Sequence, residues 1–378
     1  MPLLPDAEIF KRLVDGTDRG LVPTLARIGL AGLAVPYGLM VSCRNAAYDG
    51  GLLPVTHGPV PVISVGNLTL GGTGKTPLVA WLARAAAARG LKPAIVSRGY
   101  GAARGERSDE AAELAILLPT VPHVANRDRL AGVRTAAAAG AEIALLDDGF
   151  QHRRLARDID IVVIDATDPF GAGRLFPRGL LREPLLGITR SHAVVLTRAA
   201  AVDPRRRAEI RAGFDRLCGG RLPPIWVEAT HRPLQLRSAG GSTLPLASLE
   251  SSRSVAAFAG IGNPAAFRTS LEASGGTVAG FRAFPDHHRY TSADLQSLRA
   301  WAVELHADFL VTTLKDLVKV PAERLGSIPL VALEIALEML PAGGTSAGLE
   351  SLLDRLIGST IQPSFAEAAV GRNSRELS

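Results

Sequence analysis

A glycine-rich segment of the chain combines glycines, a lysine and hydroxyl residues between an expected strand and an expected helix. Backbone N–H groups of such a loop can surround phosphate oxygens, and the positive end of the helix dipole adds to the attraction. Lys75 would reach the β- and γ-phosphates of a nucleotide, and the Thr76 hydroxyl would hold Mg²⁺. We therefore expect ATP to bind on the following residues: Thr69, Leu70, Gly71, Gly72, Thr73, Gly74, Lys75 and Thr76.

Two adjacent carboxylates close an apolar run further along the chain. Asp147 and Asp148 follow residues 143–146, which are typical of a buried strand. Successive side chains of a strand point to opposite faces, so one carboxylate can serve a metal while the other orients a reacting group. Asp165 closes a similar run, where it is either a second functional acid or a residue that caps the next turn.

Two further groups carry side chains that can move protons. Asp109 and Glu110 follow a loop at the end of an expected strand, where ligands gather in parallel sheets, although acids also favour the start of a helix. Asp286, His287 and His288 place two imidazoles beside a carboxylate. Histidine carries protons near neutral pH, and neighbouring histidines do not face a single metal. The residues alone leave catalytic and structural roles open.

Composition limits the class of protein. The chain has 378 residues, of which 47% are hydrophobic and 21% charged, which is enough for two modest globular domains. Its formal net charge of +6 suits a phosphorylated substrate or an acidic lipid surface, or reflects composition alone. We expect no nucleic-acid partner, because only 5% of the residues are aromatic and no nucleic-acid-binding motif is recognised.

The most apolar region near the N-terminus covers residues 21–43, in which only Arg27 is charged. Its uncharged part, residues 28–43, is shorter than the about 20 residues that span a bilayer. A helix in the membrane interface and a buried helix of the first domain are the two alternatives. In the first, five cations would lie near acidic headgroups: Lys11, Arg12, Arg19, Arg27 and Arg44.

Short apolar runs alternate with helical segments beyond residue 54, which predicts an α/β fold of the P-loop NTPase type, with a mostly parallel sheet and helices on both faces. Residues 230–252 are expected to form a linker to a second, smaller α/β domain. We expect four parts: an apolar N-terminal helical segment at 1–53, a P-loop domain at 54–229, the smaller domain at 230–361 and a flexible tail at 362–378.

Several motifs, taken in order over residues 54–320, resemble the lipid A 4′-kinase (tetraacyldisaccharide 4′-kinase) family. Thr69, where the strict phosphate-loop pattern has glycine, looks like this family's own loop. The motifs are Val65-Gly66-Asn67-Leu68-Thr69, Ser97-Arg98-Gly99-Tyr100-Gly101, Asp147-Asp148-Gly149-Phe150-Gln151-His152, Ile161-Val162-Val163-Ile164-Asp165, Leu181-Arg182-Glu183-Pro184, Phe258-Ala259-Gly260-Ile261-Gly262-Asn263-Pro264, Asp286-His287, and Thr312-Thr313 with Lys315-Asp316.

The resemblance implies an enzyme at the cytoplasmic face of the bacterial inner membrane. It would use ATP and Mg²⁺ to phosphorylate the 4′-hydroxyl of a tetraacylated glucosamine disaccharide 1-phosphate. The family's catalytic Asp–His pair, contributed by two domains, falls on Asp109 and His287, and Lys75 and Asp148 complete the implied catalytic set. The metal ligands implied by the resemblance are Thr76, Glu110 and Asp147.

The chain departs from the family at three positions. Ser108 and Ala111 stand where the family usually has Gly and Pro around Asp109 and Glu110, and Leu314 stands where it usually has Glu. The loss of the Gly and Pro weakens the assignment of Asp109, and Leu314 removes a salt bridge.

The expected partners are an acylated disaccharide phosphate and a membrane surface reached through residues 1–53, with no obligate protein partner inferred. Guanidinium groups suit phosphate, although each arginine is as readily part of a solvated basic face. The candidates for the substrate's 1-phosphate are Arg153, Arg154, Arg157, Arg174, Arg178 and Arg182. The alternative function is a P-loop NTPase switch or a metallochaperone-like protein that hydrolyses nucleotide to drive a partner.

Overall fold

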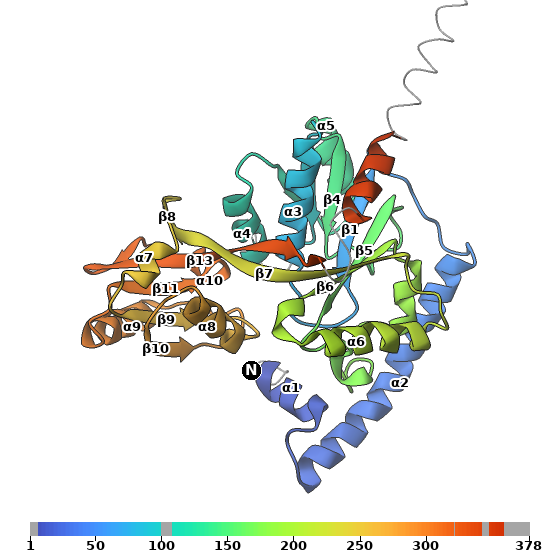
Figure 1. Ribbon diagram of the computed structural model, residues 1–378. Coiled ribbons are helices and arrows are strands. Elements are labelled where there is room, and N and C mark those ends of the chain that lie inside the picture. Colours follow the sequence, from blue (N-terminus) through green and yellow to red (C-terminus); the bar gives the residue numbers. More distant parts are fainter. Residues whose placement is uncertain (1–6, 100–107, 321, 342–347, 359–378) are drawn as a thin grey trace, which may run out of the picture.

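A computed structural model describes residues 7–99, 108–320, 322–341 and 348–358 of the chain. The tail at 362–378, and Tyr100 and Gly101 of the second motif, lie outside the described residues. Figure 1 shows two lobes side by side, with a long helix leaving the larger one.

The larger lobe is a parallel sheet with helices on both faces. Its strands run in the order β6 (Ala193–Thr197), β5 (Ile159–Asp165), β1 (Val62–Asn67), β4 (Ile143–Asp147), β2 (Pro93–Ser97) and β3 (His123–Ala125). The helices α3 (Lys75–Ala88) and α4 (Asp109–Leu117) pack on one face, and α5 (Arg129–Ala138) and α6 (Pro204–Leu217) pack on the other.

Neighbouring residues of each strand enter opposite cores, as the period of two requires. Ile63 of β1 packs with Leu78 of α3, whereas Val62 packs with Val133 of α5. The apolar runs of the sequence are continuous because both faces of these strands are buried. The predicted P-loop type of fold is confirmed.

The smaller lobe continues the same sheet. It contains β9 (Val255–Ala259), β10 (Val278–Ala283), β11 (Phe309–Thr313) and β13 (Ile328–Met339), with α8 (Pro264–Ala273) and α9 (Ser292–Glu304) on opposite faces. The strand β7 (Ile225–Ser238) joins the lobes, since it pairs in parallel with β6 and then antiparallel with β13. The sheet therefore runs β10-β9-β11-β13-β7-β6-β5-β1-β4-β2-β3 through both lobes (Figure 1).

The linker expected at 230–252 is wrong. These residues form the second half of β7, then β8 (Thr243–Leu244) and α7 (Ala247–Glu250). Pro233 obscures the strand in the sequence because proline cannot donate a ladder hydrogen bond, and the register shift between Glu334 and Ile335 of β13 lies opposite it. The division of the chain at residues 53, 229 and 361 stays a prediction.

Two helices precede the first strand, α1 (Ala7–Asp15) and α2 (Leu21–Asp49). The 29 residues of α2 make it long and apolar enough to cross a membrane, by length and composition. It is not a buried helix, since Val41 is its one buried residue. Its inner side docks on the larger lobe, where the Tyr37 hydroxyl donates to the Arg182 carbonyl at 2.7 Å.

After the smaller lobe the chain returns to the larger lobe. Residues 348–358 are helical, and Leu349 and Leu353 are buried. Arg89 Nε and Asp354 Oδ1 form an ion pair of 2.7 Å that ties this helix to the end of α3. The red helix beside β1 and β4 in Figure 1 is this segment.

Candidate active site

The phosphate loop lies between β1 and α3, as predicted. Gly71 and Gly74 have φ of 106° and 86°, a region that favours glycine. At Gly74 an added Cβ would also lie 2.9 Å from His231 Nε2. Because α3 begins at Lys75, its unpaired N–H groups and positive dipole end face this loop, which suits a bound phosphate.

The remaining loop residues are fixed by the segment at 180–181 on one side and by the end of β6 on the other. Thr69 forms a bridge with Leu181, and the Leu70 N–H donates to the Leu180 carbonyl at 2.7 Å. On the other side, the Thr197 hydroxyl donates to the Thr73 carbonyl at 2.7 Å. The motif around Leu181-Arg182-Glu183-Pro184 is thus a structural support for the phosphate loop.

Lys75 points at the end of β4. Its Nζ lies 3.2 Å from Asn67 Oδ1 and 3.4 Å from Asp148 Oδ1. Arg182 Nη1 donates to both oxygens of Asp148, at 2.9 and 2.8 Å. Burial alone would raise the pKa of Asp148, but Lys75 and Arg182 outweigh it and lower the pKa to about 2. Asp148 is therefore a permanently ionised group between two cations.

The backbone around Asp148 is set by close packing. Asp148 itself has φ of 56°, and a Cβ at Gly66 would lie 2.4 Å from Phe150 Cβ. Gln151 Nε2 donates to the Asn67 carbonyl at 2.8 Å. The segment after β4 is thus held directly against the strand that leads into the phosphate loop.

Asp147 faces the opposite way and is buried. Burial raises its pKa to about 6, although the charge of Lys75 opposes the shift. Its Oδ1 is buried and has no hydrogen-bond partner in the described part of the chain. An unpaired buried carboxylate oxygen beside the phosphate loop suits a cation ligand, so the residues present fit Mg²⁺.

Thr76 and Glu110, the other predicted metal ligands, lie in the first turns of α3 and α4. The charge of Glu110 contributes to the raised pKa of Asp147, which places the two acids near each other. The described residues contain no group of three or more His, Cys, Asp or Glu side chains that could hold a metal alone. Mg²⁺ needs few protein ligands when it binds with nucleotide phosphates, so this does not conflict with the prediction.

Asp109 and His287 meet across the two lobes. His287 Nδ1 lies 3.0 Å from Asp109 Oδ2. Asp109 is the first residue of α4, and Ser108 caps this helix by accepting from the Ala111 N–H. Ser108 therefore stabilises the start of α4 at the position where the family usually has glycine. His287 follows β10 in a left-handed conformation, with φ of 60°.

Two lysines four residues apart complete this group. Lys315 lies on the short helix α10 (Leu314–Leu317), and Lys319 follows it. Lys315 Nζ lies 3.2 Å from His287 Nε2, and Lys319 Nζ lies 3.2 Å from Asp109 Oδ2. Burial opposes the shift, but the hydrogen bond from His287 and the charge of Lys319 lower the pKa of Asp109. Sequence reasoning missed Lys319, whose i, i+4 spacing from Lys315 was the available signal.

Leu314, the third departure from the family, is buried at the start of α10. It packs in the main apolar core and takes no part in an ion pair. The helix is instead fixed by its cap, in which Thr313 accepts from the Asp316 N–H.

The structure forms two groups of site residues, one around Lys75 and one around Asp109. Among the described residues, no hydrogen bond or ion pair joins the two groups directly. The charges of Lys315 and Asp147, one from each side, both act on Glu113 of α4. Burial raises the pKa of Glu113 to about 7, and sequence reasoning gave no sign of this residue.

Four of the six candidate arginines are engaged within the protein: Arg153 with Asp49, Arg157 with Asp160, Arg178 with the Val14 carbonyl, and Arg182 with Asp148. Arg154 and Arg174 are exposed. These two are the better candidates for an anionic group of a substrate.

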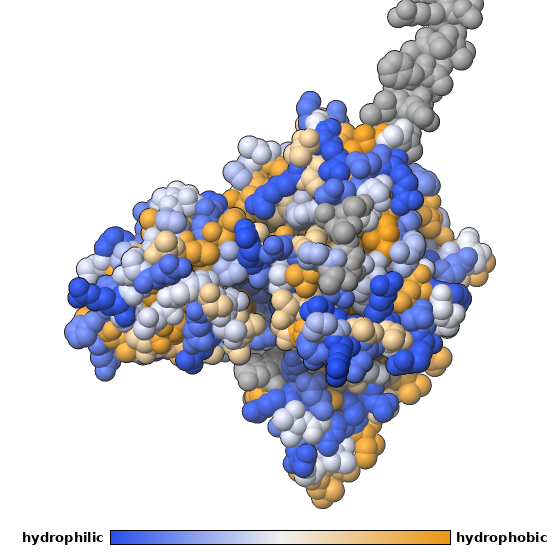
Figure 2. Space-filling model, viewed as in Figure 1, coloured by the Kyte–Doolittle hydropathy of each residue, from blue (hydrophilic) through white to orange (hydrophobic). Residues whose placement is uncertain are grey.

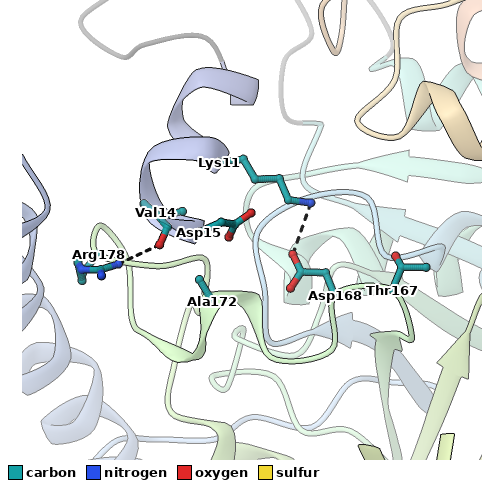
Figure 3. A pocket seen from close by; sticks show the side chains of 7 residues that line it. All are labelled: Lys11, Val14, Asp15, Thr167, Asp168, Ala172 and Arg178. Atoms are coloured by element: carbon teal, nitrogen blue, oxygen red, sulfur yellow. Dashed lines mark hydrogen bonds and ion pairs between the residues drawn. The ribbon is translucent and has the colours of Figure 1, made fainter. Parts of the chain in front are cut away.

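A separate cavity of ≈ 400 Å³ lies between α1 and the loop after β5 (Figure 3). Arg178, a candidate for the substrate's 1-phosphate, lines it, whereas the phosphate loop, Asp109 and His287 do not. Lys11 pairs with Asp168 across it at 3.5 Å, and Arg178 donates to the Val14 carbonyl at 3.0 Å. These contacts attach α1 to the larger lobe.

Asp165 supports the phosphate loop. Its Oδ1 accepts from the Thr167 N–H and hydroxyl, and its Oδ2 pairs with Arg198. Arg198 Nη2 in turn donates to the Gly72 carbonyl at 3.0 Å. Asp165 thus caps the next turn, which was one of the two alternatives for this residue. It also holds Arg198 on the phosphate loop.

Replacing Arg198 by methionine is expected to raise KM for ATP about 10-fold, because a charge-assisted hydrogen bond to the loop is lost. The initial rate measured against ATP concentration tests this. Arg206→Met is the matched control, since the Arg206 side chain is exposed and pairs with exposed Glu209 on the same helix, α6. An unchanged KM in Arg198→Met would mean that the loop keeps its shape without the arginine.

Comparisons with known proteins now identify the family. The profile of the "Tetraacyldisaccharide-1-P 4'-kinase" family matches residues 26–357. Tetraacyldisaccharide 4'-kinase of Anaeromyxobacter sp. (strain K) is 39% identical over 93% of this chain and 96% of its own length. The corresponding enzyme of Geobacter sulfurreducens is 36% identical, with 92% and 98% covered.

A solved structure agrees with these relatives. The crystal structure of LpxK from Aquifex aeolicus in complex with ATP matches with a TM-score of 0.68 and 31% identity, over 88% of this chain and 99% of that chain. The chain therefore belongs to the tetraacyldisaccharide-1-P 4′-kinase family.

Proposed function

We propose that the protein transfers the γ-phosphoryl group of ATP to the 4′-hydroxyl of a tetraacylated glucosamine disaccharide 1-phosphate, a lipid A precursor, and so forms the 1,4′-bisphosphate. The observation that carries this proposal is the contact of 3.0 Å between Asp109 and His287. A carboxylate and an imidazole supplied by two lobes, beside a phosphate loop, suit a reaction in which a second substrate must be positioned and deprotonated.

In this mechanism the loop from Thr69 to Thr76 holds the phosphates of ATP. Lys75 leaves its contact with Asp148 to neutralise charge on the transferred group. Thr76, Glu110 and Asp147 would hold Mg²⁺, which supplies positive charge to the phosphate oxygens when bound. Asp148 remains ionised beside Arg182 and keeps the end of β4 in place.

Asp109 accepts the proton of the attacking hydroxyl, and His287 orients it. The contacts with His287 and Lys319 lower the pKa of Asp109, which makes it a weak base. Phosphoryl transfer tolerates this, because the transition state is loose and the proton leaves the hydroxyl late. Positioning and electrostatic stabilisation therefore carry most of the rate gain.

The test is transfer of label from γ-labelled ATP to tetraacyldisaccharide 1-phosphate in mixed micelles with Mg²⁺. A disaccharide whose 4′-hydroxyl is methylated serves as the matched acceptor that cannot react. We expect label in the lipid with the free hydroxyl only. Release of label as free phosphate with either lipid would instead favour the NTPase switch or the metallochaperone-like protein.

We also propose that α2 binds the cytoplasmic face of the inner membrane, where ATP is available. Exposed apolar side chains lie along this helix, among them Leu25, Ile28, Leu33 and Leu39. Figure 2 shows hydrophobic residues along the lower right edge and at the lowest tip of the molecule, where α2 runs. The helix docks through Tyr37 beside Arg182, so a lipid substrate would reach the site from the same side.

Replacing Leu33 and Leu39 by glutamate is expected to weaken binding to vesicles about 100-fold or more, because each buried leucine contributes about 1.5–3 kcal/mol. Both side chains are 61% exposed, so the fold should survive. Sedimentation with vesicles that contain anionic lipid measures the effect. Leu217→Glu on α6, at a residue 55% exposed, is the control. Equal binding of the wild type, the variant at Leu33 and Leu39, and Leu217→Glu would contradict the role of α2.

A further inference from the structure

We propose that Lys315 and Lys319 are positioning residues that leave Oδ1 of Asp109 as the oxygen that receives the substrate proton. Lys315 would do so by deciding which nitrogen of His287 carries hydrogen, and Lys319 by occupying Oδ2. The role of Oδ1 as proton acceptor rests on the proposed kinase reaction. The position of the hydrogen on His287 rests on side-chain contacts alone.

The first step concerns the imidazole of His287. Lys315 Nζ lies 3.2 Å from His287 Nε2, and an ammonium group can only donate. Nε2 must therefore accept, which leaves the proton of the neutral ring on Nδ1. That nitrogen lies 3.0 Å from Asp109 Oδ2 and donates to it. Lys315 is itself held by Asp286 Oδ1 at 3.1 Å, so its direction is fixed.

The second step concerns Lys319. Its Nζ lies 3.2 Å from Asp109 Oδ2 and 3.2 Å from Asp316 Oδ1. The Lys319 side chain is only 9% exposed and Asp316 is fully buried. Asp316 is fixed in turn by the Gly260 N–H and the Thr313 hydroxyl, each at 2.8 Å from Oδ2. The ammonium group of Lys319 is therefore a rigid bridge between the lobes.

The two oxygens of Asp109 consequently differ. Oδ2 receives donors from His287 and from Lys319, whereas Oδ1 has no hydrogen bond with any described residue. In the reaction the O–H bond of the sugar hydroxyl breaks and an O–H bond forms on Asp109 Oδ1. The hydroxyl oxygen bonds to the γ-phosphorus, and ADP leaves with the electron pair of the broken P–O bond.

The sharpest test reads the hydrogen on His287 directly. The full-length protein, with ¹⁵N in its histidines, is studied by NMR at about pH 8.5, some two units above the ordinary imidazole pKa. His287→Gln identifies the signals of this ring among the eight histidines of the chain. We expect a protonated Nδ1 and an unprotonated Nε2 in the wild type. A proton on Nε2 in the wild type would overturn the inference.

Variants at Lys315 test whether this residue sets the tautomer of His287 or only stabilises the fold. Lys315→Met, which has a similar shape but no donor, should move hydrogen toward Nε2 and lower kcat about 10-fold with KM for ATP unchanged. Lys315→Arg keeps a donor and should retain the wild-type ring signals. An unchanged tautomer in Lys315→Met would refute the role of Lys315. If Lys315→Met does not fold, Lys315→Leu, which also lacks a donor, takes its place.

Lys319→Arg tests the bridge. Arginine keeps the charge, and we expect it to retain most of kcat and the wild-type tautomer of His287. Loss of the Nδ1 proton in Lys319→Arg would contradict the separate roles given to the two lysines. The ring signals need no substrate, so failure of the kinase reaction would leave this test standing and would be recognised separately, as absence of label in the lipid.

Discussion

Replacing Lys75 by methionine is expected to reduce phosphoryl transfer about 10³-fold or more, which corresponds to about 4 kcal/mol of transition-state stabilisation. Lys75 begins α3 and is the cation of the phosphate loop, and among the described residues its ammonium group contacts Asn67 and Asp148. Methionine keeps the length of the side chain but removes the charge. Single-turnover transfer of label from ATP measures the loss.

The control for this change is Lys92→Met. Lys92 is an exposed residue before β2 of the same lobe, so the net charge falls equally in both variants. We expect Lys92→Met to behave as the wild type, and both proteins to melt within a few degrees of it. Transfer by Lys75→Met at more than about a tenth of the wild-type rate would contradict the assignment of Lys75.

Asp109→Asn is expected to lower kcat by about 10²–10⁴-fold, the usual range for loss of a general base. ATP binding should survive, because Asp109 belongs to the second group of site residues and not to the phosphate loop. Equilibrium binding of a nucleotide and steady-state transfer, measured on the same preparation, separate the two effects. Asp215→Asn, at an exposed position of α6, controls for the lost charge.

A double variant strengthens this prediction. Because Asp109 and His287 act as one unit, Asp109→Asn combined with His287→Gln should be about as slow as Asp109→Asn alone. Multiplicative losses in the double variant would show that the two side chains act independently. Full activity of Asp109→Asn would remove this residue from the mechanism.

The larger lobe was predictable because its signals are local. Continuous apolar runs between helices identify strands buried on both faces, and β4 (Ile143–Asp147) lies within one residue of the strand expected at 143–146. The phosphate loop needs only neighbouring residues, from Thr69 to Thr76, so its place between strand and helix could be inferred from spacing.

Contacts between the lobes were not predictable from spacing. Asp109 and His287 are 178 residues apart. Only the family resemblance indicated that these two residues form a pair. Lys319, Glu113 and Arg198 act through partners on other elements, and no local pattern distinguishes them from surface charges. The strand β13 was also missed, because its apolar residues fit both a helix and a strand.

The helix at 348–358 has a consequence for how the protein is made. Most of the P-loop lobe emerges from the ribosome long before Leu349 and Leu353 are synthesised. These two residues nevertheless belong to the same core as Leu78. Throughout synthesis of the smaller lobe, this part of the core lacks its cover and stays open to water. The helix at 348–358 therefore closes the first lobe, and a ribosome that stops near residue 345 would release a kinase lobe that chaperones and proteases recognise.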